Sequence, residues 1–206
     1  DFWIGLPDSE FHRVSDIYPS KPSPLQFLFP LIAKLPRFLL PGPTKFLVDF
    51  GDTSKPVGAA FNNPPISSNE GMEANTKKWR NAEIPAANGH ATARSIAKLY
   101  GVLANGGSLD DFHLLSPDTI ERGRETQSDG KDLVLGGMHT RFGLGFMLGT
   151  ENVSMGPNPN AFGHGGAGGS LGFSDPDNHI SLGFVMNQMH PGITAWKTAT
   201  DVAESV

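Results

Sequence analysis

The sequence predicts a globular protein in which helices are followed by strands, and three observations carry that prediction. Apolar residues recur at helical spacing through residues 92–105, before the stop signal Asn105-Gly-Gly107. A second helix start is marked by Ser116 followed by Pro117. From Arg141 onward apolar residues alternate with small ones, which is typical of strands.

Composition narrows the class of protein further. The chain has 206 residues, 38% of them hydrophobic, which is enough for one domain or a domain with an appendage. The net charge is −5 and no basic run exceeds Lys77-Lys78, so the sequence predicts no nucleic-acid partner. The absence of cysteine excludes disulfides and thiol catalysis. The seven histidines lack metal-ligand spacing, so we expect no metal and no cofactor.

The first part of the chain, residues 1–80, is predicted to be a Pro-rich and partly helical flap or insert. Its longest apolar tract, 22–33, is about a dozen residues and contains three prolines, so we expect short helical turns and no transmembrane segment. The flap could pack on the core, form the lid or mouth of a substrate pocket, or contact a partner or a membrane surface. Residues 81–206 are predicted to hold the main helices and antiparallel strands.

The helices and strands of that second part have readable limits. Thr92 is the expected N-cap of the first helix, and Ser116 caps a second that should end by about Gln127. The expected strands are 141–148, 162–174 and 180–187, with a turn at 175–179 between the last two. A final helix should follow Pro191-Gly192, with its apolar positions at Ile193, Trp196, Thr200 and Ala203.

Three motif matches are interpreted as accidental. Ser95-Ile-Ala-Lys98 has the Ser-x-x-Lys pattern, but Ser95 lies inside the helix that Thr92 caps. Gly168-Gly-Ser-Leu-Gly172 resembles a nucleophile elbow, which requires a helix after the serine, whereas a strand is expected here. Gly163-His-Gly-Gly-Ala-Gly168 fits a dinucleotide fingerprint that must also open a helix.

The remaining candidate is His164-Gly165-Gly166 on a strand. Glycines weaken a strand, and a common reason for them is the close approach of a ligand or another backbone. A histidine among such glycines, after the polar loop Asn158-Pro-Asn160, predicts a substrate lying along the strand edge. The alternative is a glycine-rich bulge with a structural histidine.

Taken in order, five segments of this chain resemble the C-terminal half of the serine β-lactamase-like family, close to its class C-type esterases and peptidases and to the animal β-lactamase-like proteins. The resemblance covers residues 80–190 most strongly. Five segments carry it: Asn88-Gly-His-Ala-Thr-Ala-Arg-Ser-Ile-Ala-Lys-Leu-Tyr100, Leu103-Ala-Asn-Gly-Gly107, Leu115-Ser-Pro-Asp118, Phe142-Gly-Leu-Gly-Phe146 and Gly163-His-Gly-Gly-Ala-Gly-Gly169.

The resemblance implies an α+β fold, with a central antiparallel sheet flanked by helices, and a serine nucleophile that forms an acyl-enzyme on a small ester, amide or peptide. By similarity, His164 would line the site and the backbone N–H of Ala167 would be the second oxyanion donor. Gly165, Gly166 and Gly168 would form the substrate-binding strand edge.

The sequence departs from the family pattern in two ways, and both change the activity that we expect. The family's Ser-x-x-Lys and Tyr-x-Asn motifs lie upstream of the matched portion, and neither Tyr18 nor Tyr100 begins a Tyr-x-Asn here. We therefore expect a C-terminal segment without its nucleophile, inactive alone and self-associating through an exposed sheet edge. Having histidine instead of lysine at position 164 argues against penicillin binding. The alternative function is a noncatalytic binding or scaffold protein that retains the fold.

Overall fold

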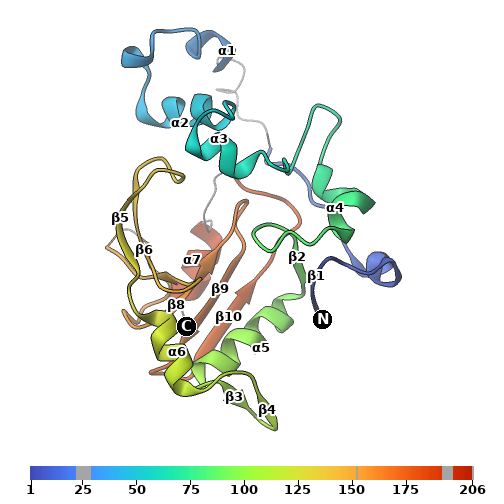
Figure 1. Cartoon of the computed structure of the whole chain (residues 1–206), viewed down its shortest axis with the longest axis vertical. Coiled ribbons are helices and arrows are strands. Elements are labelled where there is room, and N and C mark those ends of the chain that lie inside the picture. The colour runs from blue at the N-terminus through green and yellow to red at the C-terminus, as the bar shows by residue number, and fades with distance from the viewer. Residues whose placement is uncertain (22–28, 152, 192–196, 206) are drawn as a thin grey trace.

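The centre of the molecule is a six-stranded antiparallel sheet. The computed structural model describes residues 1–21, 29–151, 153–191 and 197–205. The strands follow the order β10-β9-β8-β7-β6-β5 across the sheet (Figure 1). Their bounds are β5 Ser128–Asp132, β6 Met138–Phe142, β7 Met147–Leu148, β8 Phe162–Gly165, β9 Leu171–Asp175 and β10 Ile180–Phe184.

Two apolar layers cover the opposite faces of this sheet. On one face Phe162 packs with Leu103 of helix α5 (Ala93–Ala104) and Ile120 of helix α6 (Pro117–Arg124). On the other face Phe173 packs with Ala199 of helix α7 (Lys197–Glu204). Mixed helices around an antiparallel sheet confirm the α+β prediction.

The helix predictions are largely confirmed, because capping residues fix where each helix begins. Thr92 and Ser116 each accept a hydrogen bond from the backbone three residues on, at the start of α5 and α6. Helix α6 ends at Arg124, slightly before the predicted limit. The start of the predicted final helix at Ile193 lies outside the described residues, and α7 covers its later part.

The predicted continuous strand 162–174 is wrong. It is two strands, β8 and β9, which pair antiparallel across a turn at residues 166–170. The turn forms because Gly168 adopts a φ of +83° and the N–H of Gly166 donates to the Ser170 carbonyl at 2.8 Å. Glycines are compatible both with a strand along which a ligand lies and with a turn, so the sequence alone did not reveal the reversal.

The predicted strand 141–148 is also divided, into the end of β6 and the two-residue β7. Gly145 takes a φ of +84°, and the loop at 143–146 packs against α6, where the N–H of Leu144 donates to the Gly123 carbonyl at 2.8 Å. The return strand predicted as 180–187 ends earlier, at Phe184. Strand β5 was not predicted.

The first part of the chain contains short elements only, as its prolines predict. Short helices α1 to α3 project from one end of the molecule (Figure 1). Strand β1 crosses to pair with β2, with Trp3 opposite His90. The bounds are β1 Phe2–Ile4, η1 Asp8–Arg13, α1 Phe29–Ile32, η3 Arg37–Leu39, α2 Gly42–Phe50, α3 Pro56–Phe61, η4 Glu73–Asn75, α4 Lys77–Asn81 and β2 Gly89–Ala91.

A small hairpin completes the description, with β3 at Ser108–Leu109 and β4 at Phe112–His113, between α5 and α6. In the part of the chain that the structure describes, no helix is both long and apolar enough to cross a membrane.

Candidate functional site

Strand β8 has an open edge where the sequence predicts the site. Its neighbour β7 pairs only with Phe162 and Gly163, while β9 pairs with all four residues of β8. His164 and Gly165 therefore have no strand partner on the β7 side within the described structure. A substrate can add to this edge through main-chain hydrogen bonds, as peptides do on other open strands.

His164 is exposed at this edge, while the residues on either side of it are buried. Its Nδ1 lies 2.6 Å from the Gly165 carbonyl oxygen, so Nδ1 carries the proton and donates it. Its ring also contacts that of Phe142, with the centroids 5.9 Å apart. These contacts orient the ring and leave Nε2 as the nitrogen available to a ligand.

The turn after β8 presents a backbone donor. Other backbone groups of the turn are already hydrogen-bonded. The N–H of Gly169 donates to the Gly166 carbonyl at 3.0 Å, and the N–H of His190 donates to the Gly168 carbonyl at 2.9 Å. The N–H of half-buried Ala167 has no acceptor among the described residues. A free N–H at this position is the group that the resemblance assigns to the oxyanion hole.

Two glycines of the turn have little space beside them, and the positive φ of Gly168 favours glycine there as well. A Cβ at position 166 would lie 2.2 Å from the Ser170 hydroxyl oxygen, and one at position 168 would lie 2.8 Å from the Met189 side chain. The turn is thus packed tightly from both sides. Larger residues at these positions would shift the Ala167 amide that lies between them.

Ser95 does not have the surroundings of a nucleophile. Its hydroxyl lies 2.8 Å from the Thr92 hydroxyl, and its N–H already donates to Thr92. Lys98 is exposed, and its amine makes no hydrogen bond to Ser95 within the described structure. The interpretation of Ser95-Ile-Ala-Lys98 as accidental is consistent with this arrangement.

The other two motifs also lack their required context. Ser170 is followed directly by strand β9 and not by a helix, which does not fit a nucleophile elbow. The same strand, and not a helix, follows Gly168, so the dinucleotide fingerprint has no helix N-terminus for a pyrophosphate.

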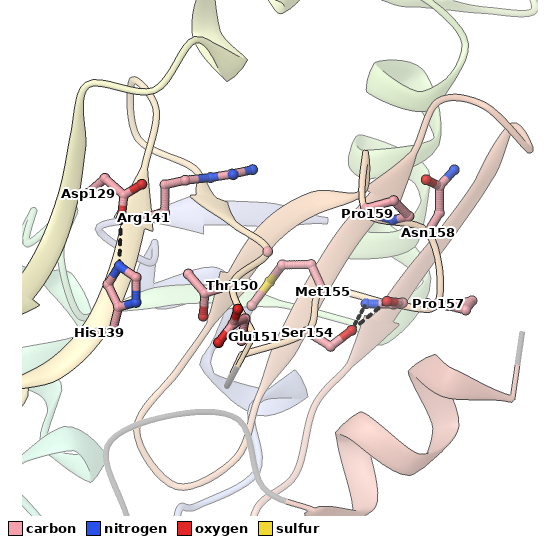
Figure 2. A pocket seen from close by; sticks show the side chains of 12 residues that line it. Asp129, His139, Arg141, Thr150, Glu151, Ser154, Met155, Pro157, Asn158 and Pro159 are labelled. Carbon is pink, nitrogen blue, oxygen red and sulfur yellow. Dashed lines mark hydrogen bonds and ion pairs between the residues drawn. The ribbon is translucent and has the colours of Figure 1, made fainter.

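A larger pocket lies elsewhere on the sheet, and sequence analysis did not find it. It has a volume of about 520 Å³ and does not include His164. Figure 2 shows its lining, in which the Asp129 carboxylate contacts His139 Nε2 at 2.6 Å. The lining residues are Asp129, His139, Arg141, Gly149, Thr150, Glu151, Ser154, Met155, Gly156, Pro157, Asn158 and Pro159. Asp129, His139 and Arg141 come from the β5–β6 hairpin, and the other lining residues come from the segment between β7 and β8. Strand β5 carries no apolar alternation that would have predicted this hairpin.

A smaller pocket of about 210 Å³ adjoins the turn after β8. It includes Met189 and His190, which also contact Gly168 of the turn. Ile66 and Met72 add apolar surface from the first part of the chain. This pocket therefore borders the turn through Met189 and His190.

The antiparallel sheet with helices on both faces and an open glycine-rich strand edge defines a β-lactamase/transpeptidase-like hydrolase fold. The chain belongs to the Beta-lactamase family, whose model matches residues 1–204. Among curated proteins, it is 38% identical over 111 residues to the "Esterase/beta-lactamase LipL" of Mycobacterium tuberculosis, covering 52% of this chain and 24% of that protein.

Solved structures show the same likeness. A family VIII carboxylesterase is 32% identical with a TM-score of 0.71, covering 98% of this chain and 46% of its own. A penicillin-binding protein homologue from Caulobacter crescentus is 35% identical with a TM-score of 0.72, covering 100% and 47%. EstA from Arthrobacter nitroguajacolicus Rue61a is 26% identical with a TM-score of 0.69, covering 96% and 46%. The chain thus spans about half the length of these structures and about a quarter of LipL.

Proposed function

We propose that this chain is the C-terminal segment of a serine hydrolase, in which it supplies the substrate-binding strand edge and one oxyanion donor. The observation that carries the proposal is the Ala167 N–H, which has no acceptor in the described structure and follows an open strand edge. In this role the edge at Gly165 and Gly166 aligns the substrate. Gly168 keeps the turn in place, and the Ala167 N–H stabilises the charge that develops on the carbonyl oxygen.

The nucleophile comes from outside these 206 residues in this proposal. Ser95 is engaged with Thr92, and Ser170 lacks the helix that an elbow needs. The chain's coverage of about half of its structural relatives supports a longer protein that carries the Ser-x-x-Lys motif upstream. We also retain the division into a flap at 1–80 and a catalytic-fold part at 81–206.

Ester, amide or peptide cleavage through an acyl-enzyme is the reaction we propose for the whole protein. One structural relative is a family VIII carboxylesterase and another is EstA. The curated relative LipL is an esterase/beta-lactamase. His164 supplies no permanent cation where a lysine would, so we expect neutral esters to be preferred over penicillins with their carboxylate.

The test is covalent labelling of the full-length protein with a fluorophosphonate, followed by intact-mass analysis and peptide mapping. We expect one adduct per molecule on a serine outside residues 1–206, together with hydrolysis of p-nitrophenyl butyrate. An adduct on Ser95 or Ser170 would place the nucleophile in this chain and refute the proposal. If the protein shows no adduct and no turnover, the alternative is indicated, which is a noncatalytic binding or scaffold protein with this fold.

The role of the Ala167 amide has its own variant pair. Ala167→Pro removes the N–H, and Ala167→Gly retains it as the control. Because loss of one oxyanion donor costs about 10²–10³ in kcat, Ala167→Pro should lower kcat by that factor with a much smaller change in KM. Circular dichroism would establish that both variants fold, and equal kcat values for the folded variants would contradict the assignment.

A further inference from the structure

The pocket on β5 and β6 contains an arginine without a partner. No hydrogen bond or ion pair reaches the Arg141 side chain within the described residues, and its Nε is inaccessible to solvent. The other mostly buried arginines are paired: Arg80 with Asp16 at 2.7 Å, and Arg124 with Glu121 at 2.7 Å. A guanidinium that is partly withdrawn from water gains most from a carboxylate, which it can bind through two parallel hydrogen bonds.

The carboxylate opposite Arg141 on the adjacent strand contacts a histidine instead. Asp129 stands opposite Arg141 in the β5–β6 pairing, but its Oδ1 contacts His139 Nε2 at 2.6 Å. Figure 2 shows the Arg141 side chain extending away from Asp129, across the space toward the wall that contains Asn158 and Pro159. The guanidinium is therefore directed into the pocket and not toward the adjacent strand.

The rest of the lining suits the hydrocarbon part of a small ligand. Pro157 and Pro159 are exposed and give the lining apolar surface, and the core residue Met155 also borders the pocket. The pocket's volume of about 520 Å³ lies within the 300–1,000 Å³ range usual for small-molecule sites. Asp129 and Glu151 also lie on the lining, so a second negative charge on the ligand would be repelled.

We propose that this pocket binds a small monocarboxylate, with Arg141 as the residue that holds its carboxylate. The inference is independent of the proposed hydrolase activity, because the pocket does not include His164 or the turn after β8. Thr150 adds a hydroxyl on the lining whose oxygen accepts from the Val153 N–H and whose proton remains available to donate.

The test uses the full-length protein and butyrate, with butyramide as the neutral match and inorganic phosphate as the polyanion. Calorimetric titration and thermal unfolding should both detect butyrate, and should show no response to butyramide or phosphate. Arg141→Gln should weaken butyrate binding at least tenfold, and Arg141→Lys should weaken it less because it keeps the charge without the planar fork. Arg94→Gln is the matched control, since Arg94 is exposed and outside the pocket, and its butyrate affinity should equal that of the unaltered protein.

Three results would overturn the proposal. Equal responses to butyrate and butyramide would show that charge is not recognised. Unchanged butyrate affinity in Arg141→Gln would place the carboxylate elsewhere. No response of the unaltered full-length protein to butyrate would show that the pocket does not take a monocarboxylate. If Arg141→Gln does not fold, the comparison of butyrate with butyramide on the unaltered protein, together with Arg141→Lys, decides the question.

Discussion

Tyr100 shows how far one side chain is removed from water at the contact between α5 and the sheet. Its ring lies against Gly172 of β9, where a Cβ would come within 2.3 Å of Cε2. Burial raises the pKa of Tyr100 to about 12, because the charged phenolate loses its hydration there. The neutral phenol is therefore favoured by the folded state.

This raised pKa predicts a loss of stability at high pH. The contribution of Tyr100 is fully present below about pH 10, the ordinary tyrosine pKa, and is lost as the pH rises toward 12. We expect the unfolding free energy to decrease between pH 8 and pH 11 by about 1 kcal/mol more than in Tyr100→Phe. Urea denaturation of both proteins at pH 8, 10 and 11 measures the difference. Parallel pH profiles would contradict it.

At the residue scale, the sequence pointed to His164 as a candidate site residue but gave no sign of the pocket that contains Arg141. His164 stood out because it is surrounded by glycines, and a local pattern of that kind survives whatever the rest of the chain does. Arg141 carried no such signal, since its lack of a partner depends on where Asp129 and His139 point after β5 and β6 pair. Interactions between distant segments are absent from a local reading.

Helix α5 lies unusually close to the sheet because two strand glycines face it. A Cβ at Gly183 of β10 would lie 2.3 Å from the Ala93 carbonyl oxygen, and one at Gly172 would meet Tyr100 and Ile96. A hydrogen bond also joins the helix to the sheet at this contact, where the Ser181 hydroxyl donates to the Ala97 carbonyl at 2.8 Å. Glycine at these positions sets the spacing between helix and sheet.

Gly172→Ala should therefore be costly. The added methyl would lie closer to the Tyr100 ring than van der Waals contact allows. Overpacking of a core contact of this kind lowers the free energy of unfolding by about 1–3 kcal/mol. Gly42→Ala is the control, because Gly42 begins α2 with nothing within 4 Å of the added Cβ. Thermal and urea unfolding should show a lower stability for Gly172→Ala and little change for Gly42→Ala. Equal stabilities would mean that the helix moves freely from the sheet.

At the element scale, helices were easier to predict than strands for a physical reason. Thr92 and Ser116 act through hydrogen bonds within three residues, so their sequence signals are local. The facing ends of β8 and β9 are set by a turn whose glycines fit either a strand or a turn when only the sequence is known. Pairing, which decides where such a strand stops, is a property of two segments together.

The whole molecule has a sheet that ends in an open strand. Strand β10 pairs only with β9 among the described strands, and the opposite end of the sheet is β5. An unpaired edge offers backbone donors and acceptors to another chain. In the longer protein that we propose, an upstream strand would cover it, and in the isolated chain a second copy is available instead.

The isolated 206-residue chain should accordingly self-associate as its concentration rises. Val185, 40% exposed just after β10, is a site where a charge should oppose edge pairing, so Val185→Lys should reduce association. Val202→Lys is the matched control, because Val202 is 37% exposed on α7 and gives the same added charge. Sedimentation velocity over a concentration series compares them. A chain that is monomeric throughout and melts cooperatively would refute the exposed-edge proposal.

The first part of the chain, which projects from the rest of the molecule, also exposes apolar side chains. Phe38 is 80% exposed and Leu31 is 70% exposed, although the Arg37 and Asp49 side chains join η3 to α2 by a two-point ion pair. The prolines of this region predicted its short helices, but they could not predict which side chains would face outward. Packing against other segments determines exposure, and few such contacts occur here.

The shortness of β7 has an evolutionary consequence. Because this strand begins only at Met147, His164 and Gly165 of β8 remain unpaired on that side, and the access of a ligand depends on strand length as well as on side chains. A descendant in which β7 continued to pair along His164 and Gly165 would retain every residue of the motif and yet be closed. In such a lineage, the strand edge could be closed or reopened by small insertions and deletions near residue 146, with no substitution at His164 or its neighbouring glycines.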